Sequence, residues 1–271
     1  MKIIIFTYRL LIVFILITLI LPLQVISNVS NSKLKYLVPY LFFKLIKYSL
    51  GINIEIDQDS KIHLDNVDEV GKLYVSNHVS WIDIIVIGSL IKSRFIAKKE
   101  VKEMGIFGFL ASLNNTFFID NTKAIRSLDY SKIIEKKLLK GENLILFPEG
   151  TTSDGSSIRK FKSSFFESAN TKYICLNTGE EKYISVCPIT ICYLKKNGLP
   201  MGTNVRRQVA WIGAYPMMSL MVDYLISGNV TISMTISDAV TIKDLGDRKK
   251  LSAYCENTIL ANLLDTLHPT I

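Results

Sequence analysis

The feature that most constrains this chain is an almost unbroken apolar stretch close to its N-terminus. Residues 10–26 read LLIVFILITLILPLQVI, and only Thr18, Pro22 and Gln24 interrupt the hydrocarbon. At 1.5 Å of rise per residue, a helix of this length is borderline for crossing a bilayer core of about 30 Å. A cleaved signal peptide is the weaker alternative, because no small-residue cleavage site follows the stretch. The stretch therefore predicts attachment to a membrane.

A second apolar segment, residues 36–50, has a different character. Pro39 suits a first helical turn and Gly51 suits the position just past a helix end. Lys44 and Lys47 lie three residues apart and share one face of that helix. This pattern is typical of an interfacial helix, whose lysines reach lipid headgroups while its apolar face sinks into the bilayer. The alternative is an ordinary core helix.

The composition favours a negatively charged partner and gives almost no support to a metal site. The formal net charge is +8, which suits nucleic acid, an anionic membrane surface or an acidic substrate. No nucleic-acid-binding motif is present. The four cysteines form no Cys-x-x-Cys pair and there are three histidines, so a zinc site is not expected. Cys187 and Cys192 lie in an apolar run, where they act as small hydrophobes in a reducing setting.

Beyond Gly51, short strand-like runs alternate with helical ones. This alternation predicts an α/β domain with a mixed, largely parallel sheet flanked by helices. We expect membrane-anchoring helices in residues 1–50 and one globular domain in residues 51–271. The expected strands are residues 52–56, 72–75, 95–97, 116–119, 143–147, 185–193, 209–212 and 230–236. The expected helices are residues 81–91, 106–113, 124–139, 161–169, 217–226 and 247–267.

The first polar cluster, residues 77–83 (NHVSWID), lies where a predicted strand meets a predicted helix. His78 is a natural general base, because an imidazole ordinarily titrates near neutral pH. Asp83 would hold that imidazole in the right tautomer. Five residues apart on one helix, the two side chains would point about 140° apart, so His78 must precede the helix and Asp83 must lie in its first turn. Alternatively, Ser80 and Asp83 form a capping box in which the carboxylate only satisfies a backbone donor.

The second polar cluster, residues 147–155 (FPEGTTSDG), also follows an apolar strand. Its Gly, Thr, Ser and Asp residues provide N–H and hydroxyl donors suited to the oxygens of a phosphate or polyol. The same residues would also form a plain loop. Glu149 argues against that simpler interpretation, because a carboxylate at the end of an apolar strand is costly unless it accepts specific hydrogen bonds.

Together, Asn77-His78-x-x-x-x-Asp83 and Phe147-Pro148-Glu149-Gly150-Thr151 resemble the glycerolipid acyltransferase family, best known from the 1-acylglycerol-3-phosphate acyltransferases. Residues 116–120 (TFFID) look like the second block of that family, and residues 186–189 (VCPI) look like its fourth. The resemblance covers roughly residues 70–240. The first and third blocks are specific in combination, and the other blocks are only supportive.

The resemblance implies an O-acyltransferase of lipid biosynthesis. His78 would deprotonate the free hydroxyl of a lysolipid, Asp83 would orient His78, and the hydroxyl would attack the thioester of acyl-CoA or acyl-carrier protein. Pro188 would shape the acyl or donor pocket. Neither a covalent acyl-enzyme nor a metal or other cofactor is implied. The acceptor would be held by Glu149, Gly150, Thr151, Thr152, Phe118, Asp120, Asn121 and Lys123.

The resemblance also implies a location. A pair of N-terminal helices would lie in one leaflet of the inner (cytoplasmic) membrane of a bacterium, against its anionic lipids. The catalytic domain would then face the cytoplasm.

Two departures from the family pattern concern the acceptor. Asn121 and Thr152 stand where relatives that bind lysophosphatidic acid usually carry arginines, and neither residue replaces a guanidinium fork on a phosphate. Lysophosphatidate, giving phosphatidic acid, is the expected acceptor because of its frequency in the family. Lyso-ornithine lipid or another lysolipid is the alternative. If the acceptor does carry a phosphate, its partner would come from Lys123, Arg126, Arg159, Lys160 or Lys162.

Two other classes of protein compete with this interpretation. A non-catalytic protein that binds anionic membranes would explain the positive charge, but not two polar clusters at strand ends. A hydrolase would need a nucleophile near His78, and no Gly-x-Ser-x-Gly elbow is present.

Overall fold

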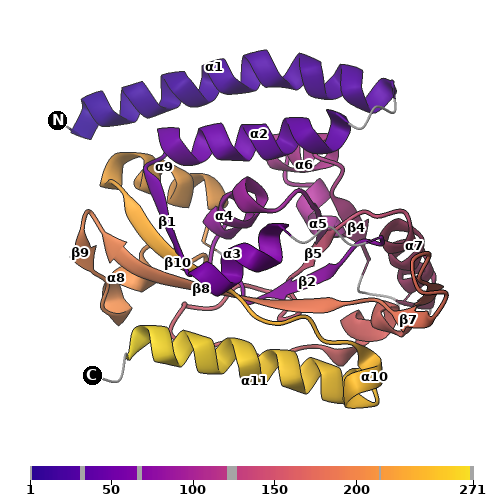
Figure 1. The fold of residues 1–271 in the computed structure, drawn as a ribbon. Coiled ribbons are helices and arrows are strands. Elements are labelled where there is room, and N and C mark those ends of the chain that lie inside the picture. Colours follow the sequence, from indigo (N-terminus) through magenta and orange to yellow (C-terminus); the bar gives the residue numbers. More distant parts are fainter. Residues whose placement is uncertain (1, 31–33, 66–68, 121–126, 214, 269–271) are drawn as a thin grey trace.

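A computed structural model describes residues 2–30, 34–65, 69–120, 127–213 and 215–268 (Figure 1). The strands are β1 (Ile52–Ile56), β2 (Leu73–Ser76), β3 (Arg94–Lys98), β4 (Phe117–Ile119), β5 (Leu144–Leu146), β6 (Lys172–Ile174), β7 (Glu181–Tyr183), β8 (Val186–Lys196), β9 (Leu199–Pro200) and β10 (Val230–Ile236). The helices are α1 (Lys2–Val29), α2 (Leu34–Ser49), α3 (Gln58–Asp65), α4 (Ile82–Leu90), α5 (Lys99–Lys102), α6 (Ile106–Leu113), α7 (Ser127–Leu139), the 3-10 helix η2 (Ser163–Asn170), α8 (Thr203–Arg207), α9 (Met217–Ser227), α10 (Ile242–Leu245) and α11 (Arg248–Leu267).

The main sheet has the strand order β1-β10-β8-β2-β5-β3-β4, and β9 pairs with β8 outside this path. The pairs β2–β5, β2–β8, β3–β5, β3–β4 and β1–β10 are parallel, whereas β8 runs antiparallel to β10. The predicted mixed, largely parallel sheet is therefore confirmed. All four residues of the central strand β2 are buried, as expected for a strand covered on both faces.

Helices cover both faces of this sheet, and successive residues of a strand feed opposite cores. In β2, Tyr74 packs into the core shared with α2, α4 and α9, whereas Leu73 and Val75 pack into the core shared with α7, η2 and α11. Figure 1 shows the same three layers, with α1 and α2 on one side and α11 on the other.

The second predicted apolar segment forms α2, which lies between α1 and α4. Its buried residues Pro39, Phe43 and Ile46 form the inner face, and Phe43 and Ile46 belong to the same core as α4. Leu45 and Tyr48 on the same helix are exposed. The helix thus packs on the core, as a core helix does, and also exposes apolar residues, as an interfacial helix does.

Polar contacts tie both ends of α1 to the rest of the protein. Near the N-terminus, the buried guanidinium of Arg9 donates to carbonyls at the C-terminal end of α9, including Gly228 O at 3.1 Å. A cation is well placed there, at the negative end of the helix dipole. Near its other end, the amides of Gln24 and Asn28 donate to Leu113 O at 2.9 and 3.0 Å. The helix consequently lies along the domain.

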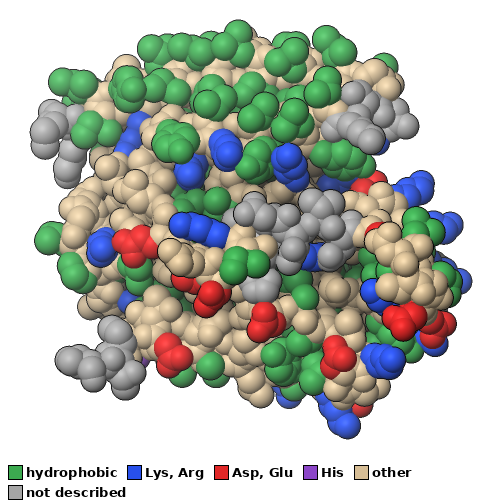
Figure 2. All heavy atoms as spheres, in the orientation of Figure 1, with side chains coloured by type: hydrophobic (Ala, Val, Ile, Leu, Met, Phe, Trp, Pro, Cys, Tyr) green, Lys and Arg blue, Asp and Glu red, His purple; other side chains and the backbone are tan. Residues whose placement is uncertain are grey.

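The outer face of α1 is apolar and open. Residues 3–29 form one helix that is long and apolar enough to cross a membrane. Only 11% of its most apolar 18-residue stretch is buried within the protein. Phe14, Leu19 and Leu23 are all more than half exposed. Figure 2 shows hydrophobic side chains gathered over α1 and α2, with lysine and arginine side chains beneath them. This ordering suits a surface at which lysines meet headgroups below a buried apolar band.

One predicted strand is wrong. Residues 209–212 follow α8 as a turn and an extended segment outside the sheet. Val209 and Ala210 are buried in the core shared with α2, α4 and α9, so their apolar character reflects burial without a strand ladder. The N–H of Trp211 donates to the Val79 carbonyl at 2.8 Å. The helix α3 was not predicted, because its residues are mostly polar. The hairpin of β6 and β7 was not predicted, because each of its strands has only three residues.

Candidate active site

The carboxyl ends of two neighbouring parallel strands bring the two polar clusters together. β2 ends at Ser76, two residues before His78, and β5 ends at Leu146, three residues before Glu149. Because β2 and β5 are paired in parallel, both loops leave the same edge of the sheet. Ligands of open α/β sheets characteristically bind at this edge.

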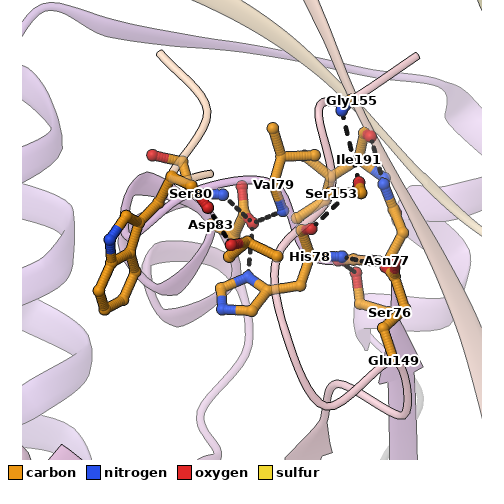
Figure 3. A network of polar contacts seen from close by, with 12 residues as sticks. Ser76, Asn77, His78, Val79, Ser80, Asp83, Glu149, Ser153, Gly155 and Ile191 are labelled. Carbon is orange, nitrogen blue, oxygen red and sulfur yellow. Dashed lines mark hydrogen bonds and ion pairs between the residues drawn. The ribbon is translucent and has the colours of Figure 1, made fainter. Parts of the chain in front are cut away.

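His78 and Asp83 meet in the predicted way. His78 lies in the loop before α4, and Asp83 is the second residue of that helix. Nδ1 of His78 lies 2.8 Å from Oδ2 of Asp83, and Figure 3 shows the two side chains pointing toward each other. The Asp83 side chain is fully buried, whereas the His78 side chain is 16% exposed. The local turn from strand to helix is therefore enough to build the pair.

Asp83 also satisfies backbone donors, as the competing interpretation required, although the predicted capping box does not form: the N-cap of α4 is Trp81, which makes no side-chain cap hydrogen bond. Oδ2 of Asp83 accepts the N–H groups of Val79 at 2.6 Å and Ser80 at 2.9 Å, at the start of α4. The two interpretations are thus compatible. The two backbone N–H groups fix the carboxylate, and the fixed carboxylate orients the imidazole.

Tyr193 is a neighbour of Asp83 that the sequence did not reveal. It lies on β8, it is fully buried, and its hydroxyl donates to Oδ1 of Asp83 at 2.7 Å. Burial and the adjacent carboxylate raise the pKa of Tyr193 well above 10, so its phenol stays a donor. Both oxygens of Asp83 are consequently engaged. Tyr193 belongs to no sequence motif. It lies 110 residues from Asp83 in the sequence, and only the folded sheet brings the two side chains together.

Glu149 holds the main chain on both sides of the site. Oε1 accepts the N–H of His78 at 2.8 Å, and Oε2 accepts the N–H of Arg159 at 2.7 Å. Burial raises the pKa of Glu149 to about 7, although these two N–H groups and the charge of His78 lower it. The carboxylate thus accepts the specific hydrogen bonds that its burial required.

The rest of His78 is fixed as well. Its carbonyl accepts the N–H of Ser153 at 2.7 Å, so the loop of Glu149 and Ser153 makes two hydrogen bonds to the main chain of His78. Its ring stacks on Phe147 with 4.0 Å between the ring centroids. Asn77, one residue before, exchanges two hydrogen bonds with the main chain of Ile191 in β8, at 2.8 and 2.9 Å. Such a preset ring needs little reorganisation before a reaction.

The other predicted residues of the Glu149 loop surround it in different ways. Gly150 has a φ of +70°, in the left-handed region that favours glycine. Thr151 is exposed. The Thr152 hydroxyl donates to the carbonyl of Trp211, which ties this loop to the segment after α8.

The remaining predicted residues lie farther along the sheet or outside the description. Phe118 lies in β4 and Asp120 just follows it, with β5 and β3 between them and β2. Pro188 is buried in β8 opposite Val75, and its pocket role stays a prediction. Asn121 and Lys123 lie outside the described residues.

This arrangement can take up a proton. Within the described part of the chain, Nε2 of His78 makes no hydrogen bond, and it belongs to a ring held at Nδ1 by a buried carboxylate. An imidazole fixed in this way can accept a proton from a hydroxyl group. Among the described residues, no group of His, Cys, Asp and Glu has the geometry to hold a metal ion.

The sequence and the fold of this chain are similar to those of known proteins. A family model described as Acyltransferase matches residues 59–192. A lyso-ornithine lipid O-acyltransferase of Brucella abortus is 29% identical over 92% of this chain and 90% of the relative. Its counterpart from Pseudomonas aeruginosa is 30% identical over 73% of this chain and 70% of the relative.

Similarity also extends to lysophosphatidate enzymes. A 1-acyl-sn-glycerol-3-phosphate acyltransferase of Neisseria gonorrhoeae is 31% identical, over 45% of this chain and 46% of the relative. The crystal structure of the 1-acyl-sn-glycerophosphate acyltransferase from Thermotoga maritima has the same fold. It covers 100% of this chain and 98% of that chain with a TM-score of 0.67 and 18% identity.

Proposed function

Because this chain belongs to the acyltransferase family, we propose that it moves a fatty acyl group from a thioester to the free hydroxyl of a lysolipid, with His78 as general base. The observation that carries this function is the 2.8 Å contact between the partly exposed His78 ring and the buried Asp83 carboxylate. A protein that only binds anionic membranes would have no use for this pair.

In the proposed reaction, Nε2 of His78 takes the proton of the acceptor hydroxyl while the hydroxyl oxygen attacks the carbonyl carbon of the thioester. The carbon–sulfur bond then breaks, and the proton passes from His78 to the leaving thiolate. Asp83 accepts a hydrogen bond from the N–H at Nδ1. This bond keeps Nε2 free for the incoming proton and stabilises the imidazolium. The acceptor oxygen is itself the nucleophile, so no acyl-enzyme forms.

Two residues act through this pair as positioning residues. Tyr193 occupies the second oxygen of Asp83, so that the carboxylate presents Oδ2 to the imidazole. Glu149 fixes the main chain of His78 through its N–H group. This assignment differs from the expected contact between Glu149 and the acceptor, because both oxygens of Glu149 are occupied by backbone donors.

The proposed acceptor is a lyso-ornithine lipid. Support comes from the relatives from Brucella abortus and Pseudomonas aeruginosa, which carry that name and match most of this chain. The Thr152 hydroxyl, where an arginine would favour phosphate, is bonded to the Trp211 carbonyl and adds no charge. Lysophosphatidate, the acceptor expected from family frequency, is the second candidate, and the 31% identity with the Neisseria gonorrhoeae enzyme favours it.

The proposed donor is acyl-CoA or acyl-carrier protein, and the proposed location is the cytoplasmic face of a bacterial inner membrane. Support for one-leaflet attachment comes from α1, whose open face is apolar while both ends are tied to the domain. The four buried free cysteines suit a reducing compartment. The net charge of +8 favours an anionic lipid surface.

A panel of acceptors tests this function. The purified full-length protein would receive labelled acyl-CoA or acyl-carrier protein with lyso-ornithine lipid, lysophosphatidate or lysophosphatidylethanolamine. We expect the largest kcat/KM with lyso-ornithine lipid. A larger value with lysophosphatidate would replace the proposed acceptor by the second candidate. Transfer to none of the lysolipids from either donor would refute acyl transfer.

A further inference from the structure

An open cavity lies beside the Glu149 loop. Its volume is about 350 Å³, within the range of small-ligand sites, and its walls come from the loop after Thr152 and from α8 and the segment beyond it. Ser153, in the cavity wall, donates its N–H to the His78 carbonyl at 2.7 Å. The wall of the cavity is therefore hydrogen-bonded to the main chain of the candidate base. Its lining residues are Ser153, Asp154, Ser157, Arg159, Arg207 and Ile212.

One side of the cavity offers a guanidinium. The main chain of Arg159 is fixed by Glu149, and its Nε donates to Thr152 O at 3.2 Å. Within the described residues, the two terminal nitrogens of Arg159 make no hydrogen bond or ion pair, and the side chain is exposed. A fork of this kind matches the two oxygens of a carboxylate. The backbone N–H and Nε of Arg159 are thus fixed, while its two terminal nitrogens are available to a ligand.

Another part of the wall offers a carboxylate. One oxygen of Asp154 accepts the N–H of Ser156 at 3.0 Å, and the other lies 3.3 Å from the guanidinium of Arg207. These two contacts lower the pKa of Asp154, so the carboxylate is charged at neutral pH. The Arg207 side chain is 58% exposed, and an exposed pair of this kind contributes little. A carboxylate has room for further donors, so a ligand ammonium can approach Asp154.

The cavity is lined by two arginines and one aspartate, so it presents both signs of charge, whereas a site for phosphate alone needs only the positive groups. Ornithine has one carboxyl and two amino groups, so ornithine acylated on one amino group keeps a carboxylate and an ammonium joined by methylenes. A phosphomonoester would instead bring a charge of about −1.5 to −2 toward Asp154. Ile212 supplies an apolar wall for the methylenes.

We propose that this cavity binds the zwitterionic headgroup of an ornithine-type lysolipid, with its carboxylate on Arg159 and its ammonium on Asp154. This inference rests on the proposed acyl transfer to such a lysolipid. It makes Asp154 a specificity-determining residue, because that carboxylate attracts an ammonium and repels a phosphate.

The test measures kcat and KM for the full-length protein in phosphatidylcholine vesicles, with lyso-ornithine lipid or lysophosphatidate as acceptor. We expect Asp154→Asn to raise KM for lyso-ornithine lipid about tenfold and to leave or lower KM for lysophosphatidate. Arg159→Gln should raise KM for both acceptors. Asp265→Asn, the same chemical change on an exposed residue of α11, is the matched control and should change neither.

A wild-type measurement keeps the inference testable if a variant fails to fold. In the lyso-ornithine acceptor, norvaline would replace ornithine, which removes the side-chain amine and nothing else. We expect the wild type to lose about tenfold in kcat/KM on this analogue, and Asp154→Asn to show no such difference between the two acceptors. Equal use of both acceptors by the wild type would overturn the inference.

The outcomes separate this inference from the proposed function. If the wild type acylates lyso-ornithine lipid but Asp154→Asn behaves like Asp265→Asn, the cavity does not bind the headgroup and the proposed function stands. If the wild type acylates only lysophosphatidate, the proposed acceptor and the inference fall together.

Discussion

Replacing Glu149 by glutamine tests whether this residue holds the site together or binds the acceptor. The carboxylate accepts N–H groups from His78 at 2.8 Å and from Arg159 at 2.7 Å. A glutamine amide has one acceptor oxygen, so one of these buried N–H groups must then face an NH₂ group. An unsatisfied buried donor costs about 1–3 kcal/mol. We therefore expect Glu149→Gln to loosen the main chain of His78.

The kinetic result should appear in kcat. A small displacement of a positioned base costs about tenfold to a hundredfold in kcat. The KM for the acceptor should change less than kcat does, because Glu149 holds Arg159 only through its backbone N–H. Steady-state acyl transfer with a radiolabelled donor measures both constants. A KM raised about tenfold with unchanged kcat would refute the positioning role and would make Glu149 an acceptor-binding residue.

The same variant should change how stability depends on pH. Burial raises the pKa of Glu149 from 4.5 to about 7, so the folded state binds a proton that the unfolded state has already released between these values. The contribution of Glu149 to the free energy of unfolding is present below pH 4.5 and is lost as the pH rises through 7. At 1.36 kcal/mol for each unit of pKa, the free energy of unfolding should fall by about 3 kcal/mol. Denaturant unfolding in micelles from pH 5 to 8 should show this decline in the wild type and a smaller one in Glu149→Gln. The same decline in both proteins would contradict the assignment.

Two further changes follow from contacts between distant parts of the chain. Tyr193→Phe removes the donor to Oδ1 of Asp83, so we expect kcat to fall about tenfold with little change in KM. In protein labelled at its three histidines, the NMR signal of the His78 Nδ1 hydrogen should also move; an unchanged rate and signal would leave Tyr193 without a positioning role. Arg9→Met removes a buried cation from the carbonyl groups that end α9, so thermal unfolding in micelles should show a loss of about 1–3 kcal/mol. Wild-type stability in this variant would mean that the contact does not fix α1.

The parts of the site that were predictable are those built locally. His78 and Asp83 are five residues apart, and the turn from β2 into α4 already brings their side chains close to each other. The cost of burying Glu149 predicted that it accepts hydrogen bonds, but not which ones. Its partner His78 lies 71 residues away, and Tyr193 lies 110 residues from Asp83. Contacts at such separations depend on strand order, which hydrophobic periodicity does not determine.

The fold follows the same division. Alternating strands and helices predicted the layered sheet, because periodicity reports how each segment is buried. The error at residues 209–212 shows the limit of that signal, since Val209 and Ala210 are buried outside any ladder. Hydrocarbon length predicted α1, but its path along the domain depends on Arg9 meeting Gly228, 219 residues away.

The central claim is that His78 takes the proton from the acceptor hydroxyl. Single-turnover acyl transfer to lyso-ornithine lipid, compared between His78→Ala and the wild type, measures this step most directly. His268→Ala, the same change on an exposed residue after α11, is the matched control. We predict that His78→Ala lowers the rate at least about a hundredfold while His268→Ala does not. A wild-type rate in His78→Ala would contradict the claim.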